Sequence, residues 1–503
     1  MASHVKGETV GAIFAIMLLI CFGWVGVGNA QTAFTKITSE SGIAEIVKQK
    51  YRQNPKWWLS GLHLADLDGD GDLDFFMSAH GGGGAVAALN DGAGHFTLAP
   101  GAYPASEIHL YYDCNEDGLL DLTMTYQDGG GQWWLNKSRP GKLSFQPTDI
   151  TRGTNTARRQ AMIDINRDGK VDWLRGSGSG IQFDFGDGKG DFTASSRTLS
   201  VPCGRSECSA MYQDIDGDGD IDLLAEWGHY ESPKGNSRIY RNDGDMNFTD
   251  VATEAGRTGK DMSIKGVGDF DQDGDPDLIV LEDKQRLEIY LNDGAGHFTK
   301  KPGAISGGEG GFTMASWGLA VATDFDNDGI ADIIVNGKNF LKILRGTGGG
   351  NFTYMNTAWG IKDTAASSVD DGLCFGDIDG DGDLDVIGYR TVWPERFFDV
   401  YRNDLPRRNW IRVRPIGRAG NKGAAGAKIR IYAAGAQQLL WYEQVAIYDH
   451  QAAQSYYGLA KTERHFGLGS RNTADINVEF YPSGKIVWRR GVTANQAMEI
   501  YED

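Results

Sequence analysis

The chain has 503 residues, 40% of them hydrophobic, which is enough for a large repeat domain and a smaller second domain. Its 70 glycines follow no G-X-Y period, which excludes a collagen-like chain. The formal net charge of −19 disfavours nucleic acid as a partner, because an acidic protein repels phosphate groups.

The first thirty residues are typical of an export signal. Lys6 gives a positive start, an apolar run extends from Val10 to Val27, and the small residues Gly28-Asn29-Ala30 resemble a cleavage site. A membrane anchor is the alternative interpretation of the same run. We predict that residues 1–30 are a signal peptide, that the mature protein is secreted or at the cell surface, and that no membrane span remains.

A nine-residue pattern, D-x-[DN]-x-D-G-x-x-D, recurs through most of the chain. Successive copies start 47 to 55 residues apart, and we number them loops one to seven. A nearly fixed period of this length is typical of stacked supersecondary units, here four-stranded propeller blades. The prediction is an all-β fold with a seven-bladed β-propeller over residues 31–405. The copies start at Asp66, Asp113, Asp164, Asp214, Asp269, Asp324 and Asp377.

Each loop is followed by a short apolar run, such as Phe75-Phe76-Met77, which predicts a buried strand. A second strand should end in a glycine turn, as in residues 89–96, because Asn-Asp-Gly tolerates positive φ. A phenylalanine segment precedes loops two to seven, but none follows loop seven. The segment Phe34–Ile43 resembles Phe352–Ile361, so we expect it to supply a strand to the last blade and to close the ring.

The acidic loops have the chemistry of calcium sites. Calcium takes six to eight oxygen ligands in a flexible shell. Side chains at positions 1, 3 and 5 can converge when glycine at position 6 turns the backbone, position 7 offers its carbonyl, and the acid at position 9 closes the shell. Solvated acidic turns without metal are the alternative, but seven matches in register favour up to seven structural Ca²⁺ ions.

The expected ligands are acids and two asparagines at positions 1, 3, 5 and 9, with the acids at position 7 where present. They are Asp66, Asp68, Asp70, Asp72 and Asp74 in loop one; Asp113, Asn115, Asp117 and Asp121 in loop two; Asp164, Asn166, Asp168 and Asp172 in loop three; Asp214, Asp216, Asp218, Asp220 and Asp222 in loop four; Asp269, Asp271, Asp273, Asp275 and Asp277 in loop five; Asp324, Asp326, Asp328 and Asp332 in loop six; and Asp377, Asp379, Asp381, Asp383 and Asp385 in loop seven.

The loops concentrate negative charge. They hold thirty Asp and Glu116 against Arg167 and Lys170, a net charge of −29, so cations should be needed to hold them closed. Because of its asparagine and two basic residues, loop three is expected to bind calcium most weakly.

Cysteine contributes little to the predicted fold. Cys203 and Cys208 could form a small disulfide loop outside the cell, with two unpaired buried thiols as the alternative. Cys114 and Cys374 have no neighbouring partner in the sequence.

The repeats resemble the FG-GAP/VCBS repeats of integrin α-subunit propellers. In that family calcium loops brace one face of the ring, and partners usually bind the other face. Residues 406–503 lack the loops and resemble the ASPIC/UnbV domain; the matching residues are Asn409-Trp410, Gly426–Ile429, His465–Gly469 and Pro482–Gly484. This arrangement resembles the cartilage acidic protein (CRTAC) family and its bacterial relatives, whose biochemical role is poorly defined.

Two classes of function are compatible with these observations. The first is a non-enzymatic extracellular binding or adhesion platform whose partner is a protein or glycan. The second is a carbohydrate-active or carbohydrate-binding protein, such as a lyase, hydrolase or lectin. Trp57-Trp58 and Trp133-Trp134 could stack on sugars, although such pairs usually pack within blades. The sequence contains no G-x-S-x-G or H-E-x-x-H motif, so we expect binding rather than catalysis.

Overall fold

The structure is a computed structural model of the chain. It describes residues 33–52, 58–80, 85–101, 103, 108–125, 131–152, 160–177, 180–201, 208–227, 237–256, 262–283, 286–307, 320–337, 340–361, 372–392, 395–449, 454–455 and 463–502. The predicted export signal, Trp57 and Cys203 lie outside these residues, as do the side chains of Trp58 and Cys208, so the signal and the disulfide stay predictions.

Two short helices near the N-terminus were not predicted. They are α1 (Thr38–Ser41) and α2 (Ile43–Arg52), separated by Gly42 at φ 80°. Ile43 and Val47, one helical turn apart, are buried against the core of the first sheet. The two described helices are too short to cross a bilayer. Of the segment Phe34–Ile43, which resembles Phe352–Ile361, only Phe34–Lys36 therefore forms a strand.

Every loop connects two neighbouring strands of one antiparallel sheet. The first strand ends directly before position 1, and the second begins at position 9, which confirms the predicted order of loop and strand. In the first four repeats the strands are β2 (Trp58–Ala65), β3 (Asp74–His80), β4 (Val86–Asn90) and β5 (Phe96–Leu98); β6 (Ile108–Tyr112), β7 (Asp121–Thr125), β8 (Gly131–Asn136) and β9 (Phe145–Arg152); β10 (Gln160–Ile163), β11 (Asp172–Ser177), β12 (Gly180–Phe185) and β13 (Ser195–Ser200); and β14 (Cys208–Gln213), β15 (Asp222–Trp227), β16 (Arg238–Asn242) and β17 (Phe248–Asp250).

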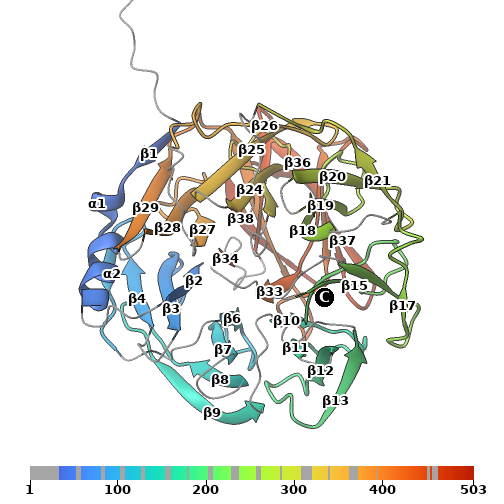
Figure 1. The fold of residues 1–503 in the computed structure, drawn as a ribbon, viewed down its shortest axis with the longest axis horizontal. Coiled ribbons are helices and arrows are strands. Elements are labelled where there is room, and N and C mark those ends of the chain that lie inside the picture. The colour runs from blue at the N-terminus through green and yellow to red at the C-terminus, as the bar shows by residue number, and fades with distance from the viewer. Residues whose placement is uncertain are drawn as a thin grey trace, which may run out of the picture. The chain divides into compact units, whose positions relative to one another are not determined.

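The remaining repeats follow the same order. Their strands are β18 (Met262–Gly268), β19 (Asp277–Glu282), β20 (Arg286–Asn292) and β21 (Phe298–Lys301); β23 (Ala320–Thr323), β24 (Asp332–Gly337), β25 (Phe340–Gly348) and β26 (Asn351–Tyr354), with β22 (Ile305–Ser306) at the edge; and β27 (Gly372–Gly376), β28 (Asp385–Val392) and β29 (Glu395–Asn403). Figure 1 shows these sheets around a common centre, with the first strands β2, β6, β10, β18 and β27 toward the middle, which is the arrangement of a β-propeller.

The N-terminal segment completes the last sheet, as predicted. Strand β1 (Phe34–Lys36) pairs antiparallel with β29, Phe34 lying opposite Asn403. The amide of Asp404 donates to the carbonyl oxygen of Ala33 at 2.6 Å, and the amide of Phe34 donates to that of Trp359 at 2.9 Å. The chain's first described strand is thus joined to the end of the last repeat.

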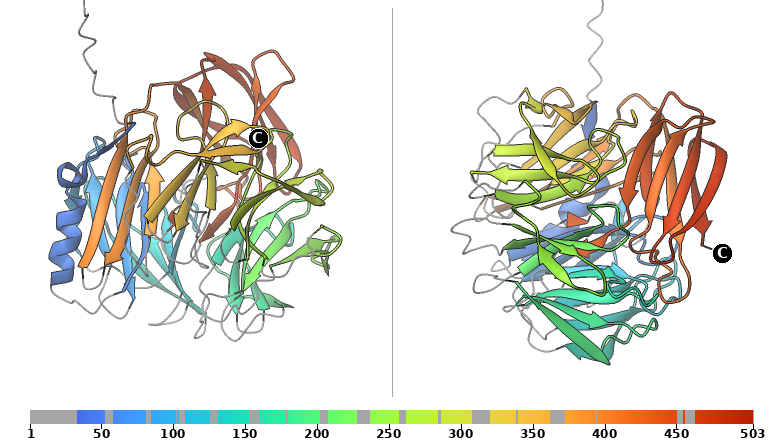
Figure 2. Two further views of the ribbon diagram at one scale, coloured as in Figure 1. Left: turned by 45° about the horizontal axis from the view of Figure 1, so that its top comes forward. Right: turned by 90° about the vertical axis from the view of Figure 1, so that its right-hand side faces the viewer.

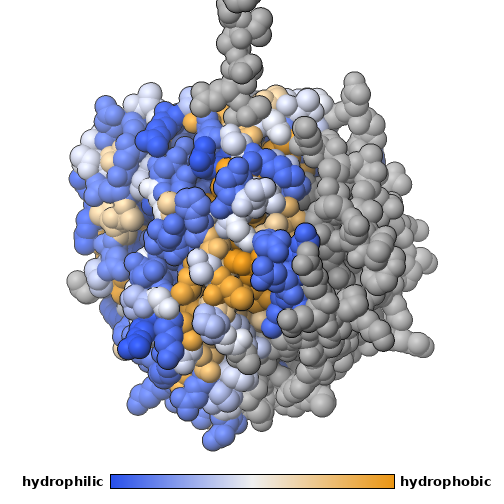
Figure 3. Space-filling model, turned by 90° about the vertical axis from the view of Figure 1, so that its left-hand side faces the viewer, coloured by the Kyte–Doolittle hydropathy of each residue, from blue (hydrophilic) through white to orange (hydrophobic). Residues whose placement is uncertain are grey.

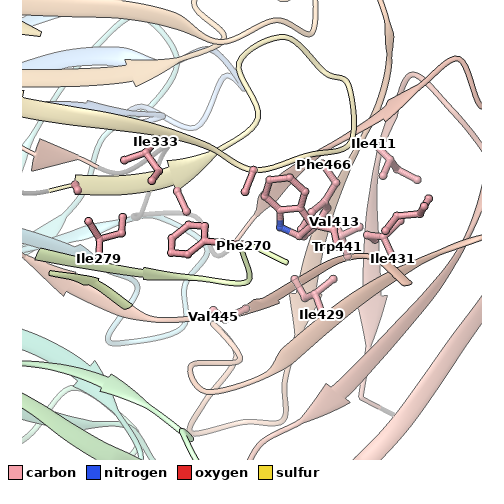
Figure 4. Close-up of a cluster of buried hydrophobic side chains, with 14 of the residues drawn as sticks. Phe270, Ile279, Ile333, Ile411, Val413, Ile429, Ile431, Trp441, Val445 and Phe466 are labelled. Atoms are coloured by element: carbon pink, nitrogen blue, oxygen red, sulfur yellow. The ribbon is translucent and has the colours of Figure 1, made fainter. Parts of the chain in front are cut away.

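The C-terminal region forms two further sheets. In one, β30 (Asn409–Ile416) lies between β35 (Arg464–Gly469) and β38 (Gln496–Tyr501). The other contains β31 (Lys428–Ala433), β32 (Leu439–Gln444), β36 (Thr473–Phe480) and β37 (Lys485–Thr493). Figure 2 shows these strands at the side of the propeller. Figure 4 shows that their buried side chains, including Trp441 and Phe466, share one hydrophobic cluster with Phe270 and Ile333 of the propeller.

Part of the C-terminal region enters the propeller sheets. Strand β33 (Ile447–Asp449) pairs with β10, and β34 (Gln454–Ser455) pairs with β27. Both partners are the first strands of their sheets, so β33 and β34 lie toward the centre of the ring (Figure 1). This segment thus connects the C-terminal region with two separate propeller sheets.

Figure 3 shows the side of the molecule on which α1 and α2 lie. Hydrophilic residues cover most of the coloured surface and surround a smaller hydrophobic area. Among the described propeller strands one large hydrophobic side chain is exposed, Leu98 of β5, at 47%.

Candidate metal centres

The acid at position 1 fixes the turn of each loop. In loop six, the Asp324 carboxylate accepts a hydrogen bond at 2.7 Å from the amide of Gly329, whose φ is 87°. A residue with a Cβ rarely adopts this φ, which explains the glycine at position 6. Equivalent bonds, 2.8 to 3.2 Å long, join position 1 to Gly71, Gly118, Gly169, Gly219, Gly274 and Gly382 in the other loops.

The acid at position 9 ties the loop to the third strand of its sheet. Asp277, which is completely buried, accepts hydrogen bonds from the amides of Phe270 and Asn292, both at 2.8 Å. Each of the other loops contains the same pair of bonds, made by Asp74, Asp121, Asp172, Asp222, Asp332 and Asp385. Position 9 therefore has a structural role that does not depend on a metal.

This distinction predicts different stabilities for two variants of loop five. Asp277→Ala removes the acceptor of two buried amides and should cost about 2 to 5 kcal/mol even in chelator. Asp273→Ala removes one of several mutually repelling acids at an exposed position. In chelator the free energy of unfolding of this variant should lie within about 0.5 kcal/mol of that of the parent protein. In calcium the variant should be less stable than the parent, because it has lost a ligand. Denaturant unfolding with and without calcium measures both, and equal losses in chelator would contradict the assignment.

A recurring asparagine at the end of a strand also joins neighbouring repeats. The side-chain amide of Asn90, which ends β4, donates to the carbonyl oxygen of Ile378 in loop seven at 2.8 Å. This bond joins the first repeat to the last one. Asn136, Asn292 and Asn403 make the same bond to the preceding loop, at 2.7 to 2.8 Å. Asn-Asp-Gly at Asn90 and Asn292 predicts a turn with positive φ, but no feature of the sequence signals this bond.

Five loops bring three carboxylate oxygens within 4.8 Å of one another and could hold a metal ion. The groups are Asp66, Asp68 and Asp70; Asp214, Asp216 and Asp218; Asp269, Asp271 and Asp273; Asp324, Asp326 and Asp332; and Asp377, Asp379 and Asp385. In the described loops two and three, no such group of three acids is found. Asn115 and Asn166 occupy position 3 there, and their side-chain oxygens accept hydrogen bonds from the amides of Asp117 and Asp168, each at 3.0 Å.

The electrostatics of the loops fit a divalent cation. Burial raises the pKa of Asp74, Asp222 and Asp277 to about 8, so ionised carboxylates are unfavourable there without a compensating charge. In loops five, six and seven, one oxygen (Oδ1) of the acid at position 3 is buried and accepts no hydrogen bond; these acids are Asp271, Asp326 and Asp379. A buried carboxylate oxygen without a partner is costly, and a hard cation is the ligand that would satisfy it.

Basic side chains approach some of the acids. In loop six, Arg345 pairs with Asp326 at 2.6 Å and also with Asp328, while Arg408 lies 2.8 Å from Asp326. In loop three, Arg167 turns away from its own acids and pairs with Asp220, at position 7 of loop four. At position 7 of loop seven, Asp383 accepts a hydrogen bond from Asn327 at 2.7 Å. In loops four and seven the position 7 side chain therefore binds a neighbouring loop.

Two protein-family models match this chain, one in the repeat region and one in the C-terminal region. A model of the FG-GAP-like repeat matches residues 113–175, 214–280, 269–335 and 324–388, and a model of the ASPIC and UnbV domain matches residues 417–503. Cartilage acidic protein 1 of Homo sapiens is 28% identical over 287 residues, covering 54% of this chain and 41% of that protein. The Mus musculus protein is 23% identical over 527 residues, covering 95% of this chain and 78% of that protein.

Similar solved structures are more distant. A lectin from Agrocybe aegerita, described with its recognition of non-reducing terminal N-acetylglucosamine, has a TM-score of 0.42 and 21% identity, covering 59% of this chain and 79% of the other. A rhamnogalacturonan lyase from Bacillus licheniformis has a TM-score of 0.26 and 13% identity, covering 89% of this chain and 73% of the other. At these values neither protein identifies a ligand for this chain.

Proposed function

This chain belongs to the proteins in which FG-GAP-like repeats precede an ASPIC and UnbV domain, and we propose that it is a secreted, calcium-braced binding platform. Residues 31–405 form a seven-bladed propeller, with one blade for each loop. Up to seven calcium ions have a structural role, bound by the acids and asparagines at loop positions 1, 3, 5 and 9 and by the carbonyl at position 7. Residues 406–503 form the second domain.

One observation carries the calcium assignment. Three loops each contain a buried position 3 oxygen that accepts no hydrogen bond, and in each of these loops that acid belongs to a converging group of three acids. Carboxylate and carbonyl oxygens in a flexible loop suit calcium better than magnesium, which dehydrates reluctantly and demands octahedral geometry. In their sheets, the loops lie between the first and second strands, so bound ions would brace every repeat.

Binding rather than catalysis is supported by the structural roles of the polar residues. His465 is a buried histidine whose Nε2 lies 2.6 Å from the side-chain oxygen of Asn327. Burial lowers the pKa of His465 to about 3, which keeps the ring neutral and unsuited to proton transfer near neutral pH. The position 9 acids accept hydrogen bonds from two backbone amides each, which is a structural role.

Affinity capture from native extracellular material tests the proposed platform. The full chain is immobilised in calcium and in chelator, with Asp273→Ala in calcium as a matched variant. We expect a protein or glycan to bind in calcium, to be lost in chelator and to bind less well to the variant. Turnover of a polysaccharide by the purified protein would contradict a non-enzymatic role.

Carbohydrate binding is the second candidate, and one exposed side chain favours it. Trp488 of β37 is 38% exposed, and the guanidinium of Arg490 lies 3.5 Å from the centre of its ring. The ring already contacts Arg490 and Tyr432, whose ring centre lies 5.4 Å away, and Arg490 pairs with Asp475 at 2.9 Å, so a sugar would meet the exposed edge of the indole. Trp133, by contrast, is only 1% exposed and packs against Trp173 and Phe192, so it is unsuited to stacking on a ligand.

A glycan array that includes acidic glycans separates these candidates. If the chain binds sugars through this strand, Trp488→Ala should abolish the signal on the array, whereas Leu98→Ala, at an exposed position on β5, should not. Binding that both variants retain equally would exclude Trp488 as the sugar site.

A further inference from the structure

Position 4 of the metal loops shows a pattern that metal binding does not explain. Glycine occupies this position in loops one, four and seven, whereas loops two, three, five and six have larger residues. These are Glu116, Arg167, Gln272 and Asn327, with φ between 55° and 65°. Residues with a Cβ rarely adopt positive φ, so four such residues at one loop position require another reason.

All four residues contact the C-terminal region. The Glu116 carboxylate accepts a hydrogen bond from the amide of Gly420 at 2.7 Å, and the Arg167 guanidinium lies 5.9 Å from the ring centre of Tyr481. The Gln272 side chain donates to the carbonyl oxygen of Leu440.

Asn327 makes the closest set of contacts. Its side-chain oxygen accepts a hydrogen bond from His465 at 2.6 Å, and its carbonyl oxygen accepts one from the amide of Gly469 at 2.8 Å. A Cβ on Gly467, between these two residues, would lie 2.0 Å from Asp324 and 2.6 Å from the Asn327 Cα. The lack of a side chain at Gly467 therefore allows the run His465–Gly469 to pack directly against loop six.

Two further loops face the C-terminal region through position 1. Lys428 pairs with Asp214 of loop four, whose amide donates to Gln444 at 3.0 Å. Arg412 lies 3.3 Å from Asp377 of loop seven. Asp66 of loop one instead lines a cavity of about 340 Å³, together with residues of loop two and of the C-terminal region. Loops two to seven thus all touch the C-terminal region.

These contacts depend on how tightly the loops are closed. The backbone groups and position 4 side chains that hold the C-terminal region belong to the same nine-residue turns as the proposed ligands. Without a cation, the acids of one loop repel one another and the turn should widen. Hydrogen bonds need donor–acceptor distances of about 2.7 to 3.2 Å and weaken steeply when the donor angle falls below about 120°. The attraction of Lys428 and Arg412 to the acids depends less on geometry and is screened by salt. Loss of geometry should therefore outweigh the gain in charge attraction.

We propose that the C-terminal domain docks on the ion-filled conformation of loops two, three, five and six, so that calcium controls its attachment to this face of the propeller. This inference rests on the proposed calcium sites. The domain is expected to stay attached when the loop contacts open, because β33 and β34 pair with β10 and β27 and because the domain shares a hydrophobic cluster with Ile279 and Ile333.

Hydrogen exchange of the full chain, followed by mass spectrometry in calcium and in chelator, tests the proposal. The reporter segments are residues 418–422 and 464–471, whose Gly420 and Gly469 amides donate to Glu116 and Asn327. Residues 474–480 of β36 pair within their own sheet and are the internal control. We expect the reporters to exchange at least about tenfold faster in chelator, a change of about 1.4 kcal/mol, with little change in the control.

Two outcomes would overturn the proposal. One is unchanged protection of both reporters while metal analysis of the same sample shows that calcium has been removed. The other is equal loss of protection in reporters and control, which would indicate only global unfolding. If the untreated protein contains no calcium, the proposed function itself fails, and the metal analysis separates that case from failure of the docking idea.

A glycine variant separates docking from metal binding. Glu116→Gly, Gln272→Gly and Asn327→Gly together introduce the residue that loops one, four and seven carry naturally, and they remove no proposed ligand. The triple variant should retain its calcium content and lose protection of residues 418–422 in calcium, because the Gly420 amide donates to the Glu116 side chain. The Gly469 amide donates to the main chain of residue 327, which the variant keeps. Retained protection would show that the position 4 residues do not hold the domain.

Discussion

Removal of calcium from the intact chain is expected to lower its midpoint of thermal unfolding by about 10 °C or more. The seven loops carry a net charge of −29, and several of their acids are buried. An ion present at about 100 times its dissociation constant stabilises the folded state by about 2.7 kcal/mol per site. Several such sites in one cooperative ring make the effect large. Differential scanning fluorimetry in calcium and in chelator measures it.

Two controls make the thermal result specific. Magnesium at the same ionic strength should restore much less of the lost stability than calcium, because it dehydrates reluctantly. Added monovalent salt in chelator should restore a small part, because it screens the repulsion between acids. An unchanged midpoint after verified removal of calcium would show that the loops close without an ion.

Loss of the N-terminal strand should be the second large effect. Deletion of residues 33–43 removes β1 and leaves β29 as an open edge of its sheet. It also removes Phe34, which is 2% exposed and packs on Phe325 and Trp359. Because burial of an aromatic side chain contributes strongly, Phe34→Ala alone should cost about 3 to 5 kcal/mol, and the deletion should cost more.

Thr35→Ala is the matched control for the strand. Thr35 lies beside Phe34 in β1 and is only partly buried, so its substitution should change the free energy of unfolding by less than about 1 kcal/mol. Denaturant unfolding in calcium compares the three variants. A deletion variant as stable as the parent would mean that the ring does not depend on this closure.

The repeat made most of the propeller predictable. A nine-residue acidic pattern that recurs every 47 to 55 residues located each loop, and glycine and apolar runs located the strands on either side. The closing strand was found because Phe34–Lys36 resembles a segment that other repeats carry. These features are local in the sequence, and their recurrence in every repeat supports the assignment of each single loop and strand.

The features missed by the sequence depend on contacts between distant residues. The residues before helix α2 resemble a repeat segment and therefore predict a strand. The helical spacing of Ile43 and Val47 becomes evident only from their burial in the structure. The pairing of β33 with β10 joins residues nearly three hundred positions apart, and no local pattern signals it. The larger residues at position 4 were visible in the sequence, but only the structure links them to His465 and Gly420.

Only the structure distinguishes the roles of the acids within each loop. All of them match one pattern, yet position 9 accepts two backbone amides, position 7 of two loops binds a neighbouring loop, and position 3 of three loops retains a buried oxygen without a partner. A pattern of residue types cannot distinguish an acid that organises a turn from one that holds an ion.

Counting bound calcium tests the central claim most directly. The full chain is equilibrated with calcium by dialysis, and its metal content is measured by elemental analysis against protein concentration. The five loops with converging acids predict at least five calcium ions per chain, and at most seven if loops two and three also bind. Fewer than five ions per folded chain at saturating calcium would contradict a calcium-braced propeller of this kind.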